Sequence, residues 1–265
     1  MPSTLFARRL LVGLFSLGLA LSAGACATPP TDPEARAEFD KINDPAEPTN
    51  RAVFSFNEAV DRNFFKPVAQ AYEDNVPEPV RRSVHNFLIN LDEPIVGFND
   101  LLQANSTRAL SATTRFMINT TFGVGGLFDM AGSWGLPHHD SDFGQTLGVW
   151  GVGEGPYITL PIFGPSNARD ATGLAVSFLA NPLTWISGTA SVLAGVARGT
   201  TQGIDERARN IDTLDDLQRN SLDFYATLRS VYRQHRDGMI EEAKSGNPNA
   251  HVEVGYPKAD TAETK

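Results

Sequence analysis

The chain has 265 residues, a formal net charge of −9 and 41% hydrophobic residues. This length suits one large domain or two small ones, and because no internal repeat or glycine-serine linker divides it, we expect one domain. The acidic balance argues against electrostatic binding to nucleic acid or anionic lipid headgroups, so any contact with a membrane must rely on apolar surface.

The first 25 residues are typical of a secretory signal peptide. Arg8 and Arg9 form a basic start, residues 10–20 are apolar and uncharged, and small residues follow. The apolar run is too short to be read as a spanning helix. We therefore predict that residues 1–25 are removed, which lowers the net charge to −11 because two arginines and no acids are lost.

Cys26 is the only cysteine of the chain and follows the small residues Ala23, Gly24 and Ala25. A lone thiol in an oxidising compartment has no intramolecular partner, which favours a lipobox that is cleaved before Cys26 and acylated on it. The alternative is an ordinary signal peptide with an incidental cysteine, since Ala23 stands where lipoboxes usually have leucine. Two or three acyl chains would anchor the protein firmly. Because Ala27, and not Asp, follows Cys26, we expect sorting to the outer membrane.

Three segments are expected after the signal peptide. Residues 26–43 are rich in proline and charge and predict a lipidated, flexible tether. Residues 44–240 have a mostly helical pattern with many breaks and form the predicted domain. Residues 241–265 predict a disordered tail.

Helices dominate the first half of the predicted domain. Apolar residues at helical spacing over 50–65 predict a helix with a wide aromatic face, and Pro67 should restart a helix at its first turn. Pro77 and Pro79 should begin another helix, which we expect to end at Pro94.

The second half contains an unusual uncharged stretch. Residues 107–119, in the first half, and residues 211–240, in the second, have ordinary amphipathic patterns, and the pattern of 211–240 suits one helix or two. Residues 171–197 carry no charge and are long enough to span a bilayer. Asn181-Pro182 interrupts this stretch, so two short helices that bend back are expected. A buried core hairpin and a half-inserted membrane hairpin both remain open.

Signals for enzymatic chemistry are weak. His138, His139 and Asp140 are adjacent, which seldom allows convergence on one metal ion, so we expect a solvent-exposed loop. The sequence has no nucleophile elbow, no zinc-binding helix motif and no complete phosphate loop. We therefore expect no catalytic residue, no metal and no cofactor.

Five aromatic, glycine and proline motifs stand out instead, and together they closely resemble the MlaA/VacJ family of outer-membrane lipoproteins. The resemblance covers roughly residues 43–240, and Pro48-Thr49 departs from the Gly-Phe that the family often has there. The motifs are NRAVFSFN (50–57), NFLINLDEP (86–94), RFMINTTFGVGGLFDMA (115–131), FGQTLGVWGVGEGPYITLPIFGPSNARDATG (143–173) and LRSVYRQHRDG (228–238).

This resemblance implies both a fold and a function. The fold is mostly α, a single helical domain that forms a ring with a central amphipathic channel, embedded in the inner leaflet of the outer membrane. The family maintains lipid asymmetry by removing phospholipids from the outer leaflet and passing them to a periplasmic carrier for return to the inner membrane. The implied localisation is the periplasmic leaflet of the outer membrane, with a covalent lipid anchor on Cys26. The implied partners are a trimeric outer-membrane porin, the carrier and membrane phospholipids, and no nucleic acid.

The family's channel loop matches Phe143–Gly153, where we predict a mobile wall of the lipid path. A phospholipid needs a dry wall for its tails and a polar route for its headgroup, and this run interleaves apolar and amide side chains with four glycines. The alternative is that these glycines pack in the core of a compact domain. The predicted channel residues are Phe143, Gln145, Thr146, Leu147, Val149, Trp150, Val152 and Tyr157, and the helix predicted to restrict the channel carries Phe54, Phe56 and Asn57.

Two other functions compete with lipid transport. A structural lipoprotein that only scaffolds porins would share the anchor and the helices, but would need no amphipathic channel. A phospholipase would need an activated nucleophile or a metal, and none of the five histidines lies in a hydrolase motif.

Overall fold

The computed structural model describes residues 30–180 and 189–246. Helices dominate the described chain, as the sequence predicts, and one antiparallel hairpin interrupts them. In chain order the elements are α2 (Pro33–Ile42), α3 (Glu47–Val60), the π-helical turn η1 (Asp61–Phe65), α4 (Lys66–Asn75), α5 (Glu78–Leu102), α6 (Ser106–Thr121), α7 (Met130–Ser133), α8 (Phe143–Val149), β1 (Tyr157–Leu160), β2 (Gly164–Asn167), α9 (Ala168–Ala180), α11 (Thr189–Arg209), α12 (Ile211–Asn220) and α13 (Phe224–Ser245).

A single helical rod runs from α3 through η1 into α4. In the π turn the backbone N–H of Lys66 donates to the carbonyl of Asp61, five residues back. Pro67 lies in the first turn of α4 and has no N–H to donate. The restart at Pro67 is therefore confirmed, and the wider π turn carries the chain into it without a break.

The expected end of a helix at Pro94 is wrong, because α5 continues through this proline to Leu102. A proline inside a helix costs one backbone hydrogen bond. Glu93, Val96 and Gly97 on either side of it are buried, and α5 packs along α6. This tertiary contact outweighs the local penalty.

Short polar residues begin several helices. Asn105, Asp129, Asp142 and Asp223 each precede a helix and accept a hydrogen bond from a backbone N–H three residues later. Such caps satisfy donors that the first helical turn leaves unpaired. Gly246 ends α13 in the left-handed conformation, at φ 69°.

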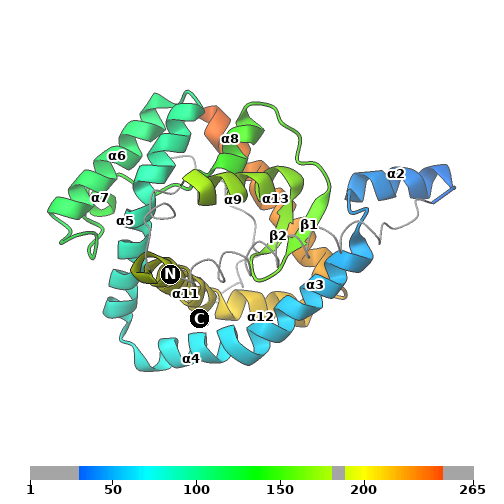
Figure 1. Ribbon diagram of the computed structural model, residues 1–265, viewed down its shortest axis with the longest axis horizontal. Coiled ribbons are helices and arrows are strands. Elements are labelled where there is room, and N and C mark those ends of the chain that lie inside the picture. The colour runs from blue at the N-terminus through cyan, green and yellow to red at the C-terminus, as the bar shows by residue number, and fades with distance from the viewer. Residues whose placement is uncertain (1–29, 181–188, 247–265) are drawn as a thin grey trace, which may run out of the picture.

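The elements follow one another around the periphery of the molecule (Figure 1). The rod of α3, η1 and α4 leads to α5, which packs on α6, and α8 packs on α9. The hairpin contacts α3 and α9 and so leads back to the start of the circuit. Its two strands have no predicted counterpart, because Pro161, Gly164 and Pro165 hide their short alternation.

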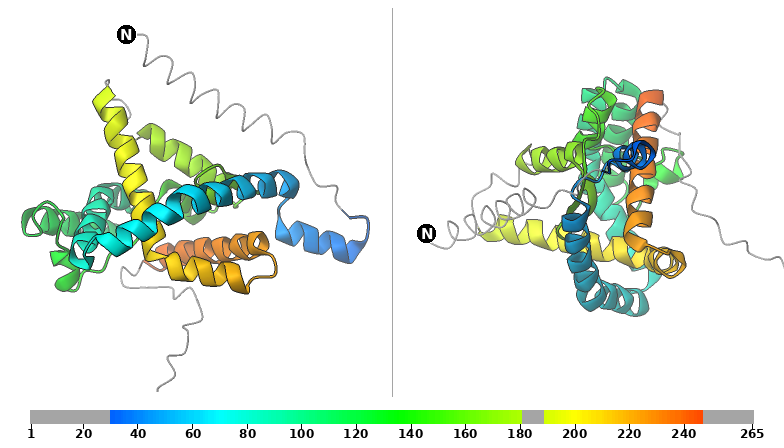
Figure 2. Two further views of the ribbon diagram at one scale, coloured as in Figure 1. Left: turned by 90° about the horizontal axis from the view of Figure 1, so that it is seen from below. Right: turned by 90° about the vertical axis from the view of Figure 1, so that its right-hand side faces the viewer.

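Residues of the uncharged stretch 171–197 belong to two helices, α9 and α11. Both helices project from the same side of the molecule (Figure 2). Asn181-Pro182 lies outside the described residues. Within the described ranges, no helix is both long and apolar enough to cross a membrane. The large apolar side chains exposed on α9 and α11 argue against a buried core hairpin; they are Leu174, Phe178, Leu179, Leu193 and Val196.

The predictions for residues 211–240, for the tether and for the C-terminal tail agree with the structure to different extents. The two-helix interpretation of residues 211–240 is confirmed by α12 and α13. Helix α13 continues to Ser245 with Ala243 buried, so residues 241–245 are helical and not part of a tail. The predicted tether likewise contains a helix, α2.

Candidate functional site

The interior of the described chain is unusually rich in charge. It contains 24 buried polar or charged residues against 12 buried hydrophobic ones. A cluster of buried aromatic side chains consists of Phe54, Tyr157 and Tyr225. A buried charge is tolerated only when it is paired and hydrogen-bonded, so the partners of these groups determine how the helices are held.

One buried network joins α5, α6 and the segment after α7. Arg115 of α6 and Glu93 of α5 lie 2.5 Å apart, and Nδ1 of His138 lies 3.1 Å from the same carboxylate oxygen. The His139 ring is hydrogen-bonded to Asp100 at 2.8 Å. These contacts tie the predicted loop to both long helices.

The expectation that His138, His139 and Asp140 form a solvent-exposed loop is therefore wrong for His139, which is 4% exposed. The segment is a loop, but it is folded into the interior. Burial lowers the pKa of His138, but its hydrogen bonds to Asp140 and Glu93 outweigh burial and raise this pKa to about 9. No group of metal-binding side chains occurs among the residues that the structure describes.

A second network positions α8, the predicted channel segment. Arg236 of α13 binds Asp142, which caps α8, at 2.6 Å and Asp170 of α9 at 2.9 Å. Tyr232 donates to the same Asp170 carboxylate. Burial raises the pKa of Asp170, but the neighbouring Arg236, Tyr232 and Arg169 lower it below its usual range. One arginine thus fixes two helices against a third.

A third network fixes the N-terminal end of the domain. Asp44 is buried and accepts hydrogen bonds from Tyr225, Arg229 and Asn50. Burial and Asp44 raise the pKa of Tyr225, so its hydroxyl stays protonated. Sequence reasoning missed Asp44, Asn50, Arg229 and Arg236 as individual residues. The available signal was the helical spacing of arginines in the LRSVYRQHRDG motif.

The predicted channel residues divide into two groups. Gln145 and Thr146 are fully buried; Gln145 donates to the Met239 carbonyl at 2.8 Å, and Thr146 accepts from Gln103 at 2.9 Å. Tyr157 is also buried and packs edge-on against Tyr225. The remaining residues are half-buried or exposed: Phe143, Leu147, Val149, Trp150 and Val152.

Trp150 is the most exposed member of this set, at 53%. Its indole N–H donates to the Leu102 carbonyl at 2.9 Å, and its ring meets Phe143 edge-on. The polar end of the indole is therefore fixed to α5, while much of the apolar ring faces outward.

The four glycines of 143–153 also have different roles. An added methyl group at Gly144 or Gly148 would collide with Asp170 or Ile240, so these two glycines pack helix α8 closely. Gly151 has φ 88° and Gly153 has open space around it. The core-packing interpretation thus fits the first pair, and backbone freedom fits Gly151. The predicted loop is in fact a helix up to Val149.

The three residues predicted to restrict the channel lie on α3 and face different surroundings. Phe54 is buried against Phe224 and Tyr225, with ring centroids 5.5 and 5.4 Å away. Phe56 is 51% exposed. Asn57 hydrogen-bonds the hairpin backbone. Cys26 lies outside the described residues.

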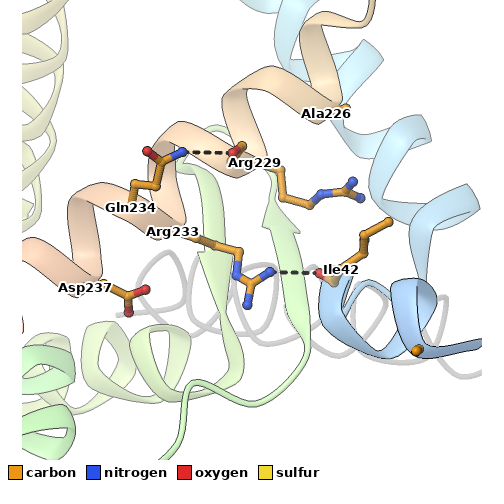
Figure 3. Close-up of a pocket in the computed structure, with 8 residues that line it drawn as sticks. Ile42, Ala226, Arg229, Arg233, Gln234 and Asp237 are labelled. Atoms are coloured by element: carbon orange, nitrogen blue, oxygen red, sulfur yellow. Dashed lines mark hydrogen bonds between the residues drawn. The ribbon is translucent and has the colours of Figure 1, made fainter. Parts of the chain in front are cut away.

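A cavity of about 680 Å³ lies between α2 and α13 (Figure 3). Arg233 projects from α13 and donates to the Ile42 carbonyl at the end of α2, at 3.2 Å. Arg233 also pairs with Glu154, and Arg229 pairs with Asp44. With both cations neutralised, this cavity offers no strong attraction to an anion, and none of the predicted channel residues lines it.

The exterior contrasts with the interior. Twenty-five large apolar side chains are exposed on the described residues. Along α5 they recur every three or four positions and form one apolar stripe: Phe87, Leu91, Ile95, Phe98 and Leu101. Exposed apolar surface on this scale marks a protein or membrane contact.

Comparison with known proteins identifies the family. The intermembrane phospholipid transport system lipoprotein MlaA of Shigella flexneri is 37% identical over 92% of this chain and 95% of its own length. The protein of the same name from Escherichia coli K12 is 36% identical over the same shares. A solved structure concerned with maintenance of bacterial outer membrane lipid asymmetry has 36% identity and a TM-score of 0.66, covering 74% of this chain and 98% of that one. Since the MlaA lipoprotein profile also matches residues 42–239, the chain belongs to the MlaA lipoprotein family.

Proposed function

We propose that this protein maintains outer-membrane lipid asymmetry by moving phospholipids out of the outer leaflet toward a periplasmic carrier. The names of the relatives and the subject of the solved structure support this function. The protein acts without bond-making chemistry and without a cofactor. Its cargo is a phospholipid.

One observation carries the proposal: many large apolar side chains are exposed, while paired charges are buried. Paired charges such as Arg115 with Glu93 occupy the interior, while phenylalanines and leucines occupy the surface. Transfer of apolar surface from water to acyl chains is favourable by about 25 cal/mol per Å². We infer that the helices lie in the periplasmic leaflet, with α9 and α11 among the acyl chains.

The helical circuit is the proposed frame of the lipid path. We infer that it forms a ring around an amphipathic channel. The half-buried and exposed residues Phe143, Leu147, Trp150 and Val152 supply apolar wall, while buried Gln145 and its neighbours hold α8 in place. Helix α3, through Phe56, restricts the opening.

The anchor and the partners complete the proposal. Acyl chains on Cys26 hold the protein at the outer membrane, a trimeric porin fixes it laterally, and a soluble periplasmic carrier receives the lipid. Replacement of Cys26 by alanine should leave a protein that fails in the pathway. Normal outer-membrane fractionation of Cys26→Ala would contradict the anchor.

The test is the outer-leaflet phospholipid content of a strain that lacks the gene. Excess phospholipid without lyso-products supports transport, no change supports a scaffold, and altered lyso-lipid supports a phospholipase. Complementation with Leu147→Asp or Trp150→Asp at matched abundance should fail, because an unpaired carboxylate resists transfer into an apolar passage. Leu222→Asp, at an exposed position on the α12–α13 turn, is the control and should complement.

A further inference from the structure

The turn of the β-hairpin presents two large apolar side chains. The strands pair in register from Tyr157 with Asn167 to Leu160 with Gly164, which leaves a three-residue turn at 161–163. Ile162 and Phe163 in this turn are 63% and 72% exposed. Nothing in the described fold covers them.

The turn is also strained. Ile162 has φ 71°, a conformation that a β-branched residue adopts only when its surroundings impose it. The Asn57 amide supplies this constraint: its Oδ1 accepts from the Ile162 N–H at 2.8 Å and its Nδ2 donates to the Leu160 carbonyl at 2.9 Å. The strained backbone exposes two apolar side chains and buries neither of them. We therefore expect the exposure of these side chains to have a function.

Helix α3 forms hydrogen bonds with the hairpin at two points. Asn50, two helical turns before Asn57, accepts from the Thr159 N–H at 2.9 Å and donates to the Tyr157 carbonyl at 3.1 Å. The Asn50 amide therefore binds the backbone of β1, and the Asn57 amide binds the end of β1 and the turn. These hydrogen bonds fix the position of the hairpin tip relative to α3.

The composition of the hairpin suits an environment of lipid acyl chains better than water or the surface of another protein. Residues 155–168 contain no charged side chain. In an acyl layer every backbone polar group must be satisfied internally. Pro161 has no N–H to satisfy, and Asn57 satisfies that of Ile162. A protein-binding tip would need neither the absence of charge over the whole segment nor this pairing.

We propose that the hairpin tip, Ile162 and Phe163, inserts among lipid acyl chains, and that Asn57 is the positioning residue that holds it there. This inference rests on the proposed membrane placement and adds a second point of insertion to α9 and α11. Contact with lipid at the tip as well as at α9 and α11 would limit the tilt of the molecule in the leaflet.

The test is quenching of a fluorescent label by nitroxide phospholipids. Phe163→Cys, Leu193→Cys and Leu222→Cys are each labelled with bimane in the full-length protein and reconstituted into phosphatidylethanolamine–phosphatidylglycerol vesicles. A fraction of the lipid carries a nitroxide on its acyl chain. The protein without an introduced cysteine sets the background from Cys26.

Quenching several-fold stronger at 163 than at 222 is expected. Quenching at 193 but not at 163 overturns the insertion of the tip and leaves the membrane placement intact. Absence of quenching at both positions contradicts both proposals. Adding Asn57→Leu to Phe163→Cys should reduce quenching at 163, while in Leu193→Cys it should leave quenching at 193 unchanged. An unchanged signal at 163 removes Asn57 from the proposal.

Discussion

At the scale of single residues, the buried charged side chains of this protein depend on specific partners. Arg115 and Glu93 are 1% and 0% exposed, and each has lost its hydration. Removing one partner of such a pair leaves an uncompensated buried charge, whereas exposed pairs contribute little. The position of a pair, and not the number of pairs, therefore determines its effect.

Replacement of Arg115 by methionine should lower the free energy of unfolding by about 3 kcal/mol, because buried Glu93 loses its arginine and keeps only His138 as a cationic partner. Arg219→Met removes an arginine from the fully exposed pair with Asp216 and serves as the control, with no measurable change expected. Urea unfolding in detergent micelles measures both. Equal losses would mean that burial of the pair has no energetic consequence.

The stability of the fold should depend on His138 in a defined pH window. Its pKa of about 9 in the folded protein lies above the unfolded value near 6.5. Protonated His138 therefore stabilises fully below about pH 6.5, and this contribution declines as the pH rises through 9. His138→Gln should cost up to about 3 kcal/mol more at pH 6 than at pH 10. Urea unfolding of both proteins at the two pH values measures this, and a constant difference would refute it.

At the scale of secondary-structure elements, helix α8 depends on close contact with α9. A methyl group added to Gly173 would lie 2.3 Å from the Gly144 backbone nitrogen. The two helices cross here without any side chain between them, so small size alone allows the contact.

Gly173→Ala should therefore destabilise the protein by about 1–3 kcal/mol through overpacking. Gly195 on α11 has no neighbour within 4 Å, so Gly195→Ala should be neutral or stabilising by about 0.5–1 kcal/mol, as alanine favours a helix. Thermal unfolding of the two variants compares them directly. The opposite order would show that α8 and α9 separate readily.

Sequence patterns predicted the positions of most helices, but not the contacts between the helices. Apolar periodicity located α3, α6, α12 and α13, because each helix buries one face. It failed at Pro94, where packing against α6 maintains the helix, and at the hairpin, whose pairing Asn50 and Asn57 impose from α3. Which arginine meets which carboxylate depends on tertiary packing: Arg115 and Glu93 are 22 positions apart, and Arg229 and Asp44 are 185 apart. No local pattern contains that information.

At the scale of the whole molecule, exposed apolar side chains are found together with buried, paired charges. The exposed side chains of α9 and α11 lie on elements that project from one side (Figure 2). A carboxylate placed there should oppose insertion by about 2.5–3.5 kcal/mol if that face reaches the bilayer centre.

Leu193→Asp should consequently reduce partition of the mature, non-acylated protein into phospholipid vesicles. Leu222→Asp introduces the same charge at an exposed position between Ser221 and Asp223 and should leave partition unchanged. Vesicle flotation separates the bound and free fractions. Equal flotation of the two variants would place α11 outside the lipid.

The buried ion pairs also determine which groups the chain presents before and after it folds. Glu93 and Asp100 of α5 meet Arg115 and Arg108 of α6 only after the two helices pack. Before that, each segment displays its charges and is compatible with water. Burial of these charges, beside the exposed apolar stripe of α5, thus arises from tertiary structure. Packing of α5 against α6 therefore changes the groups that these helices present to their surroundings from charged to apolar.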